Sequence, residues 1–332
     1  MDPLTQGAIG AAVPQATRNA ANVRVAGLLG FLSGMAADLD ILIRSSEDQL
    51  LFLEYHRQFT HSLIFIPLGG LLCAVALHWL LGARWKLTYV QTWLFCTLGF
   101  ATHALLDTTT SYGTMLLWPF SDERFSWSII PVVDPYSPAN HCIGDRLRYS
   151  PEATFCTYRI SMGGPLSELG FMQHNAAYSM AEQIAADQGH APIRIVIKPS
   201  FANILVWRTV YETSDRFYVD AVRVGISPKT YPGASIEKLD LTKDFPWLDP
   251  GSQQARDIKR FAKFSKGYIA KDPQRPLEIT DVRYAFLPNE ISALWSIELS
   301  PDASVTDYVK YRTHREDARG SAKVLWRMII GN

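Results

Sequence analysis

The sequence lacks an excess of charge of either sign, because 32 lysines and arginines balance 32 aspartates and glutamates. Without a global basic field the chain is not expected to bind nucleic acid, and without an acidic tail it has no obvious solvating segment. The length of 332 residues indicates two domains, each with ample material for a core. We therefore expect no nucleic-acid partner.

Several catalytic and targeting signatures are also absent. There is no Gly-x-Ser-x-Gly elbow, no phosphate-cradling Gly-x₄-Gly-Lys loop and no dinucleotide-binding Gly-x-Gly-x-x-Gly fingerprint. The start, MDPLTQG, has neither the basic segment nor the cleavage site of a secretory signal, so we predict a protein that is not exported and trimmed. Metal-assisted chemistry remains as the supported catalytic option.

Charge is missing most clearly from two long runs, Ser62–Leu81 and Leu87–Leu106, which contain no Asp, Glu, Lys or Arg. Each run has the length of about 20 residues that crosses a bilayer as a helix. The alternative is a helical hairpin inside a soluble core. Between the runs lie Arg84 and Lys86, and charge in so short a loop favours a cytoplasmic loop.

Metal-ligand side chains lie at both ends of this apolar stretch. Those before it are Asp38, Asp40, His56 and His61, and those at its end are His103 and Asp107. A hairpin of two spans returns the chain to the side that it left, so ligands about forty residues apart in sequence can meet at one membrane surface. With a cytoplasmic loop, both clusters and the later part of the chain would lie on the periplasmic side.

The segment Val25–Ala37 is apolar or small but short for a span, which favours an interfacial or re-entrant helix. If the helix continued through Ile43, it would form a third span that carries Asp38 and Asp40. On the periplasmic side, Cys142 and Cys156 could form a disulfide, with two free buried thiols as the alternative.

Each pair of candidate ligands has a spacing that predicts how its two side chains are directed. His103 and Asp107 are four residues apart and share one face of a helix, where they could bind one ion together. Asp38 and Asp40 would point to one side only along an extended backbone. His56 and His61 are five apart, which places them about 140° apart on a straight helix, so one of them could instead be an acid, a base or an orienting group.

Arg57 stands between those two histidines in the segment HRQFTHS. A guanidinium there could bind a phosphate or carboxylate oxygen of a substrate, or alternatively contact lipid headgroups. Oxygen and imidazole ligands together suit a divalent metal, with zinc expected and manganese or magnesium as alternatives.

The later part of the chain has alternating and amphipathic patterns that predict an α+β domain with an antiparallel sheet. We divide the chain into a membrane-embedded helical domain (1–138), a linker (139–164) and an extramembrane α+β domain (165–332). The expected strand pairs are Asn203–Glu212 with Arg216–Ile226 and Val282–Leu287 with Ala293–Leu299, a further strand is Val305–Arg312, and the expected helices are Met172–Asp187 and Gln253–Phe264.

Five motifs in order over about residues 1 to 135 resemble one family. They are MDPLTQG, AADLD, HRQFTHS, HALLD and TSYGTMLLWPFSDERFSW. The likeness is to the bacterial inner-membrane metal-dependent hydrolases, the YdjM-like family, with a distant similarity to zinc-dependent phospholipase C and P1 nuclease.

The resemblance implies a helical membrane domain in the bacterial inner membrane and a clustered metal site. It implies that Asp38 or Asp40, His61, His103 and Asp107 are the metal positions, with His56 and Arg57 in the same motif. Gln6 stands where many members carry a histidine, and the second His-x-x-x-Glu helix of the phospholipase C group is missing, so fewer metal ions are expected than in that group.

Together these patterns predict an all-α membrane domain followed by the α+β domain. The membrane domain is expected to have two transmembrane helices, with three as the alternative. The predicted function is a membrane-bound metal-dependent hydrolase that acts on phosphoesters or lipids. In it His56 and Arg57 would serve catalysis and Asp38, Asp40, His61, His103 and Asp107 would bind the metal. The alternative is a non-enzymatic inner-membrane protein with a structural metal site and a partner-binding outer domain.

Overall fold

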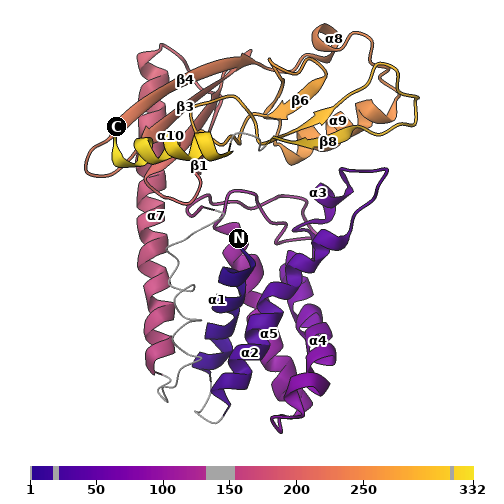
Figure 1. Ribbon diagram of the computed structural model, residues 1–332, viewed down its shortest axis with the longest axis vertical. Coiled ribbons are helices and arrows are strands. Elements are labelled where there is room, and N and C mark those ends of the chain that lie inside the picture. The colour runs from indigo at the N-terminus through magenta and orange to yellow at the C-terminus, as the bar shows by residue number, and fades with distance from the viewer. Residues whose placement is uncertain (1, 18–21, 132–153, 315–317) are drawn as a thin grey trace. The chain divides into compact units, whose positions relative to one another are not determined.

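The computed structural model describes residues 2–17, 22–131, 154–314 and 318–332. Contacts between residues divide the chain into two compact units (Figure 1). The first unit comprises Met1–Ile43 and Tyr55–Phe171, and the second comprises Arg44–Glu54 and Met172–Asn332. The short segment Arg44–Glu54 therefore belongs to the second unit although it lies early in the sequence.

The first unit is helical. Its elements are α1 (Pro3–Ala16), α2 (Val23–Ala36), the 3₁₀ helices η1 (Ala37–Leu42), η2 (Phe59–His61) and η3 (Leu63–Phe65), α4 (Ile66–Leu77), the π-helix η4 (His78–Gly82) and α5 (Tyr89–Thr108). The helix α3 (Leu51–Tyr55) crosses the boundary between the units.

The helix starts follow from local capping. The Asp2 side chain accepts the backbone N–H of Thr5, and Pro3 occupies the first turn of α1, where its missing N–H costs no hydrogen bond. At the start of α5, Thr88 and Gln91 form a reciprocal capping box. These caps fix the first residues of α1 and α5. The helix α1 carries Gln6, and α5 carries His103 and Asp107.

Glycines let α1, α2 and α5 approach closely. A Cβ added at Gly10 of α1 would lie 2.5 Å from the backbone oxygen of Gly30 in α2, and one added at Gly34 would lie 3.0 Å from the Cα atom of Gly10. Real Cβ atoms do not tolerate the first distance, so the contact between α1 and α2 requires a residue without a side chain. This packing brings the polar end of α5 against the other two helices.

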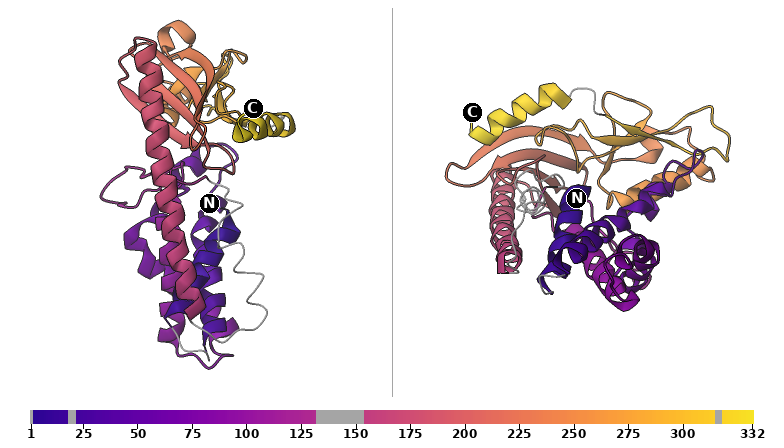
Figure 2. Two further views of the ribbon diagram at one scale, coloured as in Figure 1. Left: turned by 90° about the vertical axis from the view of Figure 1, so that its left-hand side faces the viewer. Right: turned by 60° about the horizontal axis from the view of Figure 1, so that its bottom comes forward.

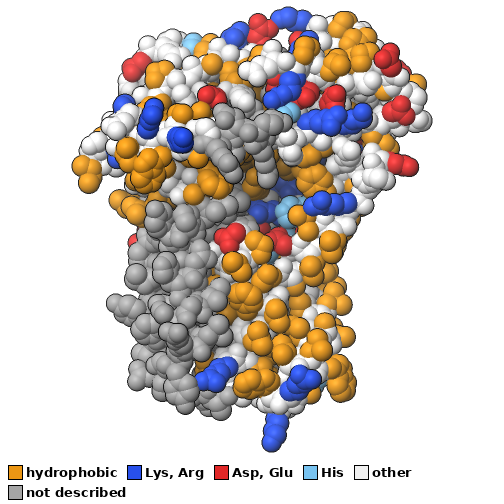
Figure 3. All heavy atoms as spheres, in the orientation of Figure 1, with side chains coloured by type: hydrophobic (Ala, Val, Ile, Leu, Met, Phe, Trp, Pro, Cys, Tyr) orange, Lys and Arg blue, Asp and Glu red, His pale blue; other side chains and the backbone are white. Residues whose placement is uncertain are grey.

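Two helices of the described residues are long and apolar enough to cross a membrane, Val23–Leu42 and Leu63–Gly82. The second matches the predicted run Ser62–Leu81. The first is α2 continued by η1, so the helix carries Asp38 and Asp40 and ends at Leu42, one residue short of Ile43. Exposed apolar side chains gather on the face of the helical unit (Figure 3), and those of Leu63–Gly82 include Leu68, Leu71, Leu72, Val75, Trp79 and Leu80.

The other predicted span, Leu87–Leu106, forms most of α5, but this helix is not among the candidate spans. Its threonines and the residues Gln91 and His103 lower its hydropathy, and its polar side chains Thr92, His103 and Asp107 are buried against neighbouring helices. The hairpin of α4 and α5 is nevertheless formed, because the two helices pack against each other.

The described residues of the second unit form helices and two four-stranded antiparallel sheets, each with its strands in sequence order. The first sheet consists of β1 (Arg194–Pro199), β2 (Val206–Glu212), β3 (Arg216–Arg223) and β4 (Lys229–Glu237), and the second of β5 (Ile269–Lys271), β6 (Glu278–Asp281), β7 (Trp295–Glu298) and β8 (Lys310–Thr313). The helices are α7 (Thr154–Asp187), which begins in the first unit, α8 (Leu241–Asp244), α9 (Gln253–Phe264) and α10 (Ala318–Ile330).

Helices cover both faces of the first sheet (Figure 2). Trp207 and Val222 lie in one cluster with Ala177 of α7, whereas their neighbours Val206 and Ala221 lie in another with Leu325 and Met328, which belong to α10. Successive strand residues point to opposite faces, so α7 and α10 pack on opposite sides of β2 and β3. The first sheet is therefore packed between two helices.

The fold class is confirmed as a helical region with two candidate membrane helices followed by an α and β region with antiparallel sheets. The hairpin β2–β3 and the helix Gln253–Phe264 are as predicted. The prediction of a strand at Val282–Leu287 is wrong, because β6 ends at Asp281. The Asp281 carboxylate accepts the backbone N–H of Arg283, and the chain turns there. The proposed Cys142–Cys156 disulfide lies outside the described residues.

Candidate metal centre

Three elements of the first unit converge at the end of the hairpin. The helix α5 carries His103 and Asp107 on one face, η1 carries Asp38, and η2 ends at His61. One donor atom from each of these four residues lies within 4.8 Å of all the others. The two sequence clusters, separated by the apolar hairpin, therefore meet at one place.

The four facing atoms are Asp38 Oδ1, His61 Nε2, His103 Nε2 and Asp107 Oδ2. Asp38 Oδ1 lies 3.5 Å from His61 Nε2 and 3.3 Å from His103 Nε2. Asp107 Oδ2 lies 3.3 Å from the first imidazole nitrogen and 3.6 Å from the second. Four donors at about 2.0–2.1 Å from a zinc ion would form a tetrahedron with edges of about 3.3–3.4 Å. The four measured separations correspond to such edges.

Each imidazole is held by its other nitrogen. His103 Nδ1 lies 2.6 Å from the backbone oxygen of Gly34, which accepts a hydrogen bond from it. His61 Nδ1 lies 2.9 Å from Thr60 Oγ1 and 3.3 Å from Asp40 Oδ2. A proton on Nδ1 of each ring leaves the Nε2 lone pair facing the other donors, which is the tautomer that binds a metal.

Asp107 is oriented from two sides. Gln6 Nε2 donates a 2.7 Å hydrogen bond to Asp107 Oδ1, and Arg57 Nε lies 3.2 Å from Oδ2. Gln6 is completely buried, and Asp107 is too. In this chain the amide of Gln6 therefore contacts the second oxygen of a candidate ligand.

Asp40 lies behind the four donors rather than among them. Its Oδ1 is 2.7 Å from His56 Nδ1, and its Oδ2 accepts hydrogen bonds from the Arg57 backbone N–H at 3.0 Å and the Thr60 hydroxyl at 2.6 Å. With His61 Nδ1 also adjacent, both oxygens are occupied by protein groups. From the sequence, Asp38 and Asp40 were equally good candidate ligands. In the structure, the Asp40 carboxylate contacts the imidazoles of both His56 and His61.

The two aspartates separate because the backbone is not extended. Asp38 and Asp40 lie in the 3₁₀ helix η1, not in the extended segment that a shared direction would require. His56 and His61 lie on no common helix, since Arg57 between them has a φ of +63°. The chain reverses there and brings both imidazoles to Asp40. Sequence spacing contains no signal for such a turn at a non-glycine residue.

Arg57 is buried, with a side chain only 5% exposed. Beyond its contact with Asp107, Nη1 donates to Thr110 Oγ1 at 3.2 Å, and the guanidinium lies 5.5 Å from the centre of the Tyr112 ring. The structure therefore places Arg57 against the candidate ligands. Thr110 and Tyr112 follow α5 and were not singled out from the sequence, where nothing distinguishes them from other residues of that polar segment.

The charges favour a cation. Three carboxylates, those of Asp38, Asp40 and Asp107, surround two imidazoles, with Arg57 as the adjacent cationic side chain. Burial lowers the pKa of His61, but the neighbouring carboxylates of Asp107, Asp38 and Asp40 outweigh it and raise that pKa to about 10. A proton on His61 therefore neutralises part of the negative charge, as a divalent ion would.

A second observation, the lack of hydrogen-bond partners for buried donor atoms, also indicates that these residues can bind a metal. His61 Nε2, His103 Nε2 and Asp38 Oδ1 are buried and have no hydrogen-bond partner. Buried polar atoms without partners are costly, and here three of them face the same point. Two imidazole nitrogens and two carboxylate oxygens are suitable ligands for Zn²⁺ and also for Mn²⁺.

Comparison with known proteins finds a family match in the N-terminal part of the chain. Residues 1–164 match the family model described as YdjM inner membrane protein. An 82-residue stretch, 23% of this chain, is 43% identical to the inner membrane protein YbcI of Escherichia coli strain K12. The matched stretch spans 44% of that relative's length. No solved structure matches the chain, and the expected likeness to P1 nuclease has no support.

Proposed function

Because its first 164 residues carry the match to the YdjM inner membrane protein family, we propose that this chain is a membrane-bound metal-dependent hydrolase. The observation that carries the proposal is the set of four facing donor atoms with four separations of 3.3–3.6 Å, and both imidazoles are held by their Nδ1 atoms. A divalent ion bound there would lower the pKa of a water molecule.

His56 is the residue that we assign to proton transfer. Its Nδ1 contacts Asp40, which leaves Nε2 to accept a proton, and its side chain is 28% exposed, whereas that of His61 is completely buried. Asp38 is the candidate ligand that also reaches solvent, with a side chain 23% exposed. Carboxylate-oriented histidines are common general bases. Arg57 would hold Asp107 in place and offset its charge.

Placement supports a phosphoester substrate, carried by a lipid. Asp38 lies near the end of the candidate span Val23–Leu42, and His61 lies two residues before the candidate span Leu63–Gly82. Ligands at the ends of two apolar helices would lie at the level of lipid headgroups. The anionic phosphate of a headgroup would meet a divalent ion there, which favours a phosphoester over an uncharged ester.

The test is hydrolysis of phosphomonoesters, phosphodiesters and phospholipids by the full chain in lipid nanodiscs after metal loading. We expect one class to be hydrolysed, and we expect His56→Gln to lower kcat by about 10²–10⁴-fold while metal content stays unchanged. Lys86→Gln, in the loop at the far end of the hairpin, is the matched control. Metal-loaded protein without hydrolysis of any class would overturn the assignment as a hydrolase.

A second candidate is a structural metal site in a non-enzymatic membrane protein. It is favoured by the number of donors, since four protein ligands complete a tetrahedron, as in structural zinc sites, whereas catalytic sites usually keep one position open. Water-proton relaxation of the Mn²⁺-loaded protein separates the two candidates. Exchangeable water on the ion supports the hydrolase, and its absence supports the structural ion.

For the orientation, we propose that the loop with Arg84 and Lys86 faces the cytoplasm. Positive charge in short loops favours the cytoplasmic side, and this loop joins η4 to α5. The metal centre at the other end of the hairpin would then face the periplasm, and we propose the same side for the α and β region.

A further inference from the structure

The segment Arg44–Glu54 separates two parts of the candidate metal centre in the sequence. Asp38 and Asp40 precede it, and His56 and His61 follow it. Its contacts, however, assign it to the second unit. Both ends of the segment thus continue directly into residues of the centre, while its middle is held by the α and β region.

Arg260 of α9 makes the principal contact with this segment. Its Nη1 and Nη2 donate to the two carboxylate oxygens of Asp48 at 3.0 and 2.8 Å, and its Nε donates to Glu54 Oε1 at 2.6 Å. On its own helix, Nη1 also donates to Asp257 at 2.8 Å. The Arg260 side chain is 20% exposed. Paired hydrogen bonds between a guanidinium and a carboxylate fix direction as well as distance.

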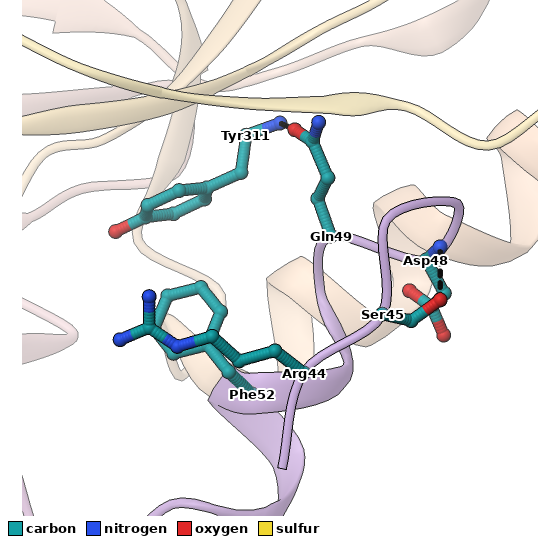
Figure 4. A pocket seen from close by; sticks show the side chains of 6 residues that line it. All are labelled: Arg44, Ser45, Asp48, Gln49, Phe52 and Tyr311. Carbon is teal, nitrogen blue, oxygen red and sulfur yellow. Dashed lines mark hydrogen bonds between the residues drawn. The ribbon is translucent and has the colours of Figure 1, made fainter. Parts of the chain in front are cut away.

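Further contacts hold the segment along β8. Gln49 Oε1 accepts the backbone N–H of Tyr311 at 2.7 Å, and the rings of Phe52 and Tyr311 meet edge to face with centres 5.2 Å apart (Figure 4). A hollow of about 230 Å³ lies beside them, lined in addition by Arg44, Ser45 and Asp48. Leu50 is buried. The segment is thus fixed at several points and not only by Arg260.

The end of the segment is close in sequence to residues of the centre. Glu54 is the next-to-last residue of α3, and His56 follows two residues later. Arg57 then donates its backbone N–H to Asp40 and contacts Asp107 through its side chain. A change in the position of Glu54 would therefore act on the short stretch of chain that leads into His56 and Arg57.

We infer that Arg260 is a positioning residue for the metal centre, so that the second unit controls the centre through Arg44–Glu54. The inference rests on the proposed metal site and adds a regulatory connection to it. When Arg260 holds Asp48 and Glu54, α3 keeps His56 and the turn at Arg57 against Asp40. When the contacts of Arg260 with Asp48 and Glu54 are lost, the hydrogen bonds that orient Asp40 weaken. The imidazole of His61, which Asp40 orients, then loses its fixed direction.

The test compares Arg260→Gln with Arg256→Gln in the full chain in nanodiscs. Arg256 lies one turn earlier in α9 and bonds only Gln253 and Gly251 among the contacts described. Binding of Co²⁺ is followed by its visible absorption, and hydrogen exchange reports the Arg57 amide. We expect Arg260→Gln to weaken Co²⁺ binding by about 10–100-fold, the usual effect of residues that support ligands, and to alter the spectrum and accelerate the exchange.

A purely structural role of Arg260 would lower the melting temperature but leave the spectrum of the bound ion unchanged, and this result would overturn the inference. Glu54→Gln is the second variant, because it removes the negative charge that pairs with Arg260 without touching α9. It should reproduce the change. Wild-type protein that binds no Co²⁺ would instead contradict the metal site itself, so the two failures are distinguishable.

Discussion

At the scale of single residues, the centre consists of four facing donors and a second set of groups that hold them. Gly34, Asp40 and Gln6 each contact a donor residue on the side away from the other donors, whereas Arg57 lies 3.2 Å from the donor oxygen Asp107 Oδ2. Such supporting contacts fix ring direction and ligand charge, and they therefore affect metal affinity without touching the ion. The roles of these residues can be separated by substitution.

Asp40→Asn tests whether Asp40 supports the centre or binds the ion. The substitution removes the charge and replaces one acceptor oxygen by an NH₂ group, which conflicts with the donors of Arg57 and Thr60. We expect metal to remain bound with an affinity about 10–100-fold lower, measured by competition with a chromophoric chelator. Glu123→Gln, an exposed change in the same unit, is the control. Complete loss of the ion would make Asp40 a ligand.

Metal affinity should increase with pH. The pKa of His61 is raised to about 10 without metal, so a proton must leave its ring before Nε2 can bind an ion. Below that pKa the proton competes with the metal, and affinity should rise by about tenfold per pH unit from this residue alone. Calorimetry in buffers of different ionisation enthalpy should show proton release at pH 7. Binding that releases no proton would contradict this assignment.

At the scale of elements, close helix packing places the ligands. Gln6 and Gly10 lie one turn apart on α1, and the contact of Gly10 with α2 sets how near Gln6 comes to Asp107. The 3₁₀ helix η1 then continues α2 and delivers Asp38. The ligands therefore depend on the packing of α1, α2 and α5 rather than on any one helix.

Gly10→Ala should disturb this packing. The added methyl group would lie 2.5 Å from the Gly30 oxygen, so α1 must move away from α2. We expect a loss of about 1–3 kcal/mol in stability, measured by thermal unfolding in detergent, and weaker metal binding through Gln6. Gly251→Ala, whose added Cβ would be in ordinary contact at 3.4 Å, is the control. Unchanged stability would show that the helices tolerate separation.

The elements also show how far the sequence predicts the site. The spacing of His103 and Asp107 and the charge-free runs were sufficient to predict that two distant clusters meet. The different positions of Asp38 and Asp40 depend on a 3₁₀ turn, and the approach of His56 to Asp40 depends on the positive φ of Arg57. Both are backbone states that tertiary contacts select, so no periodic pattern in the sequence records them.

At the scale of the whole molecule, the second unit has its own core and an early segment of the chain as part of it. The hairpin β2–β3 of this unit followed from alternation, but the assignment of Arg44–Glu54 to the unit did not, because only contacts such as those with Arg260 and Tyr311 reveal it. Long-range contacts of this kind have no local sequence signal.

The proposed topology predicts which residues a membrane-impermeant thiol reagent reaches from the periplasm. In spheroplasts of cells that express the full chain without its own cysteines, Glu123→Cys should be labelled and Lys86→Cys should be labelled only after lysis. The reason is that the loop of Lys86 is proposed to be cytoplasmic and Glu123 follows the other end of the hairpin. The reverse pattern would invert the orientation without affecting the metal centre.

The central claim is that Asp38, His61, His103 and Asp107 bind one divalent ion, and metal analysis of the purified full chain tests it most directly. We predict about one equivalent of transition metal per chain, a tetrahedral spectrum after exchange with Co²⁺, and loss of both in His61→Ala and Asp107→Asn but not in Glu123→Gln. Protein that retains no metal, or variants that retain as much as the wild type, would contradict the account.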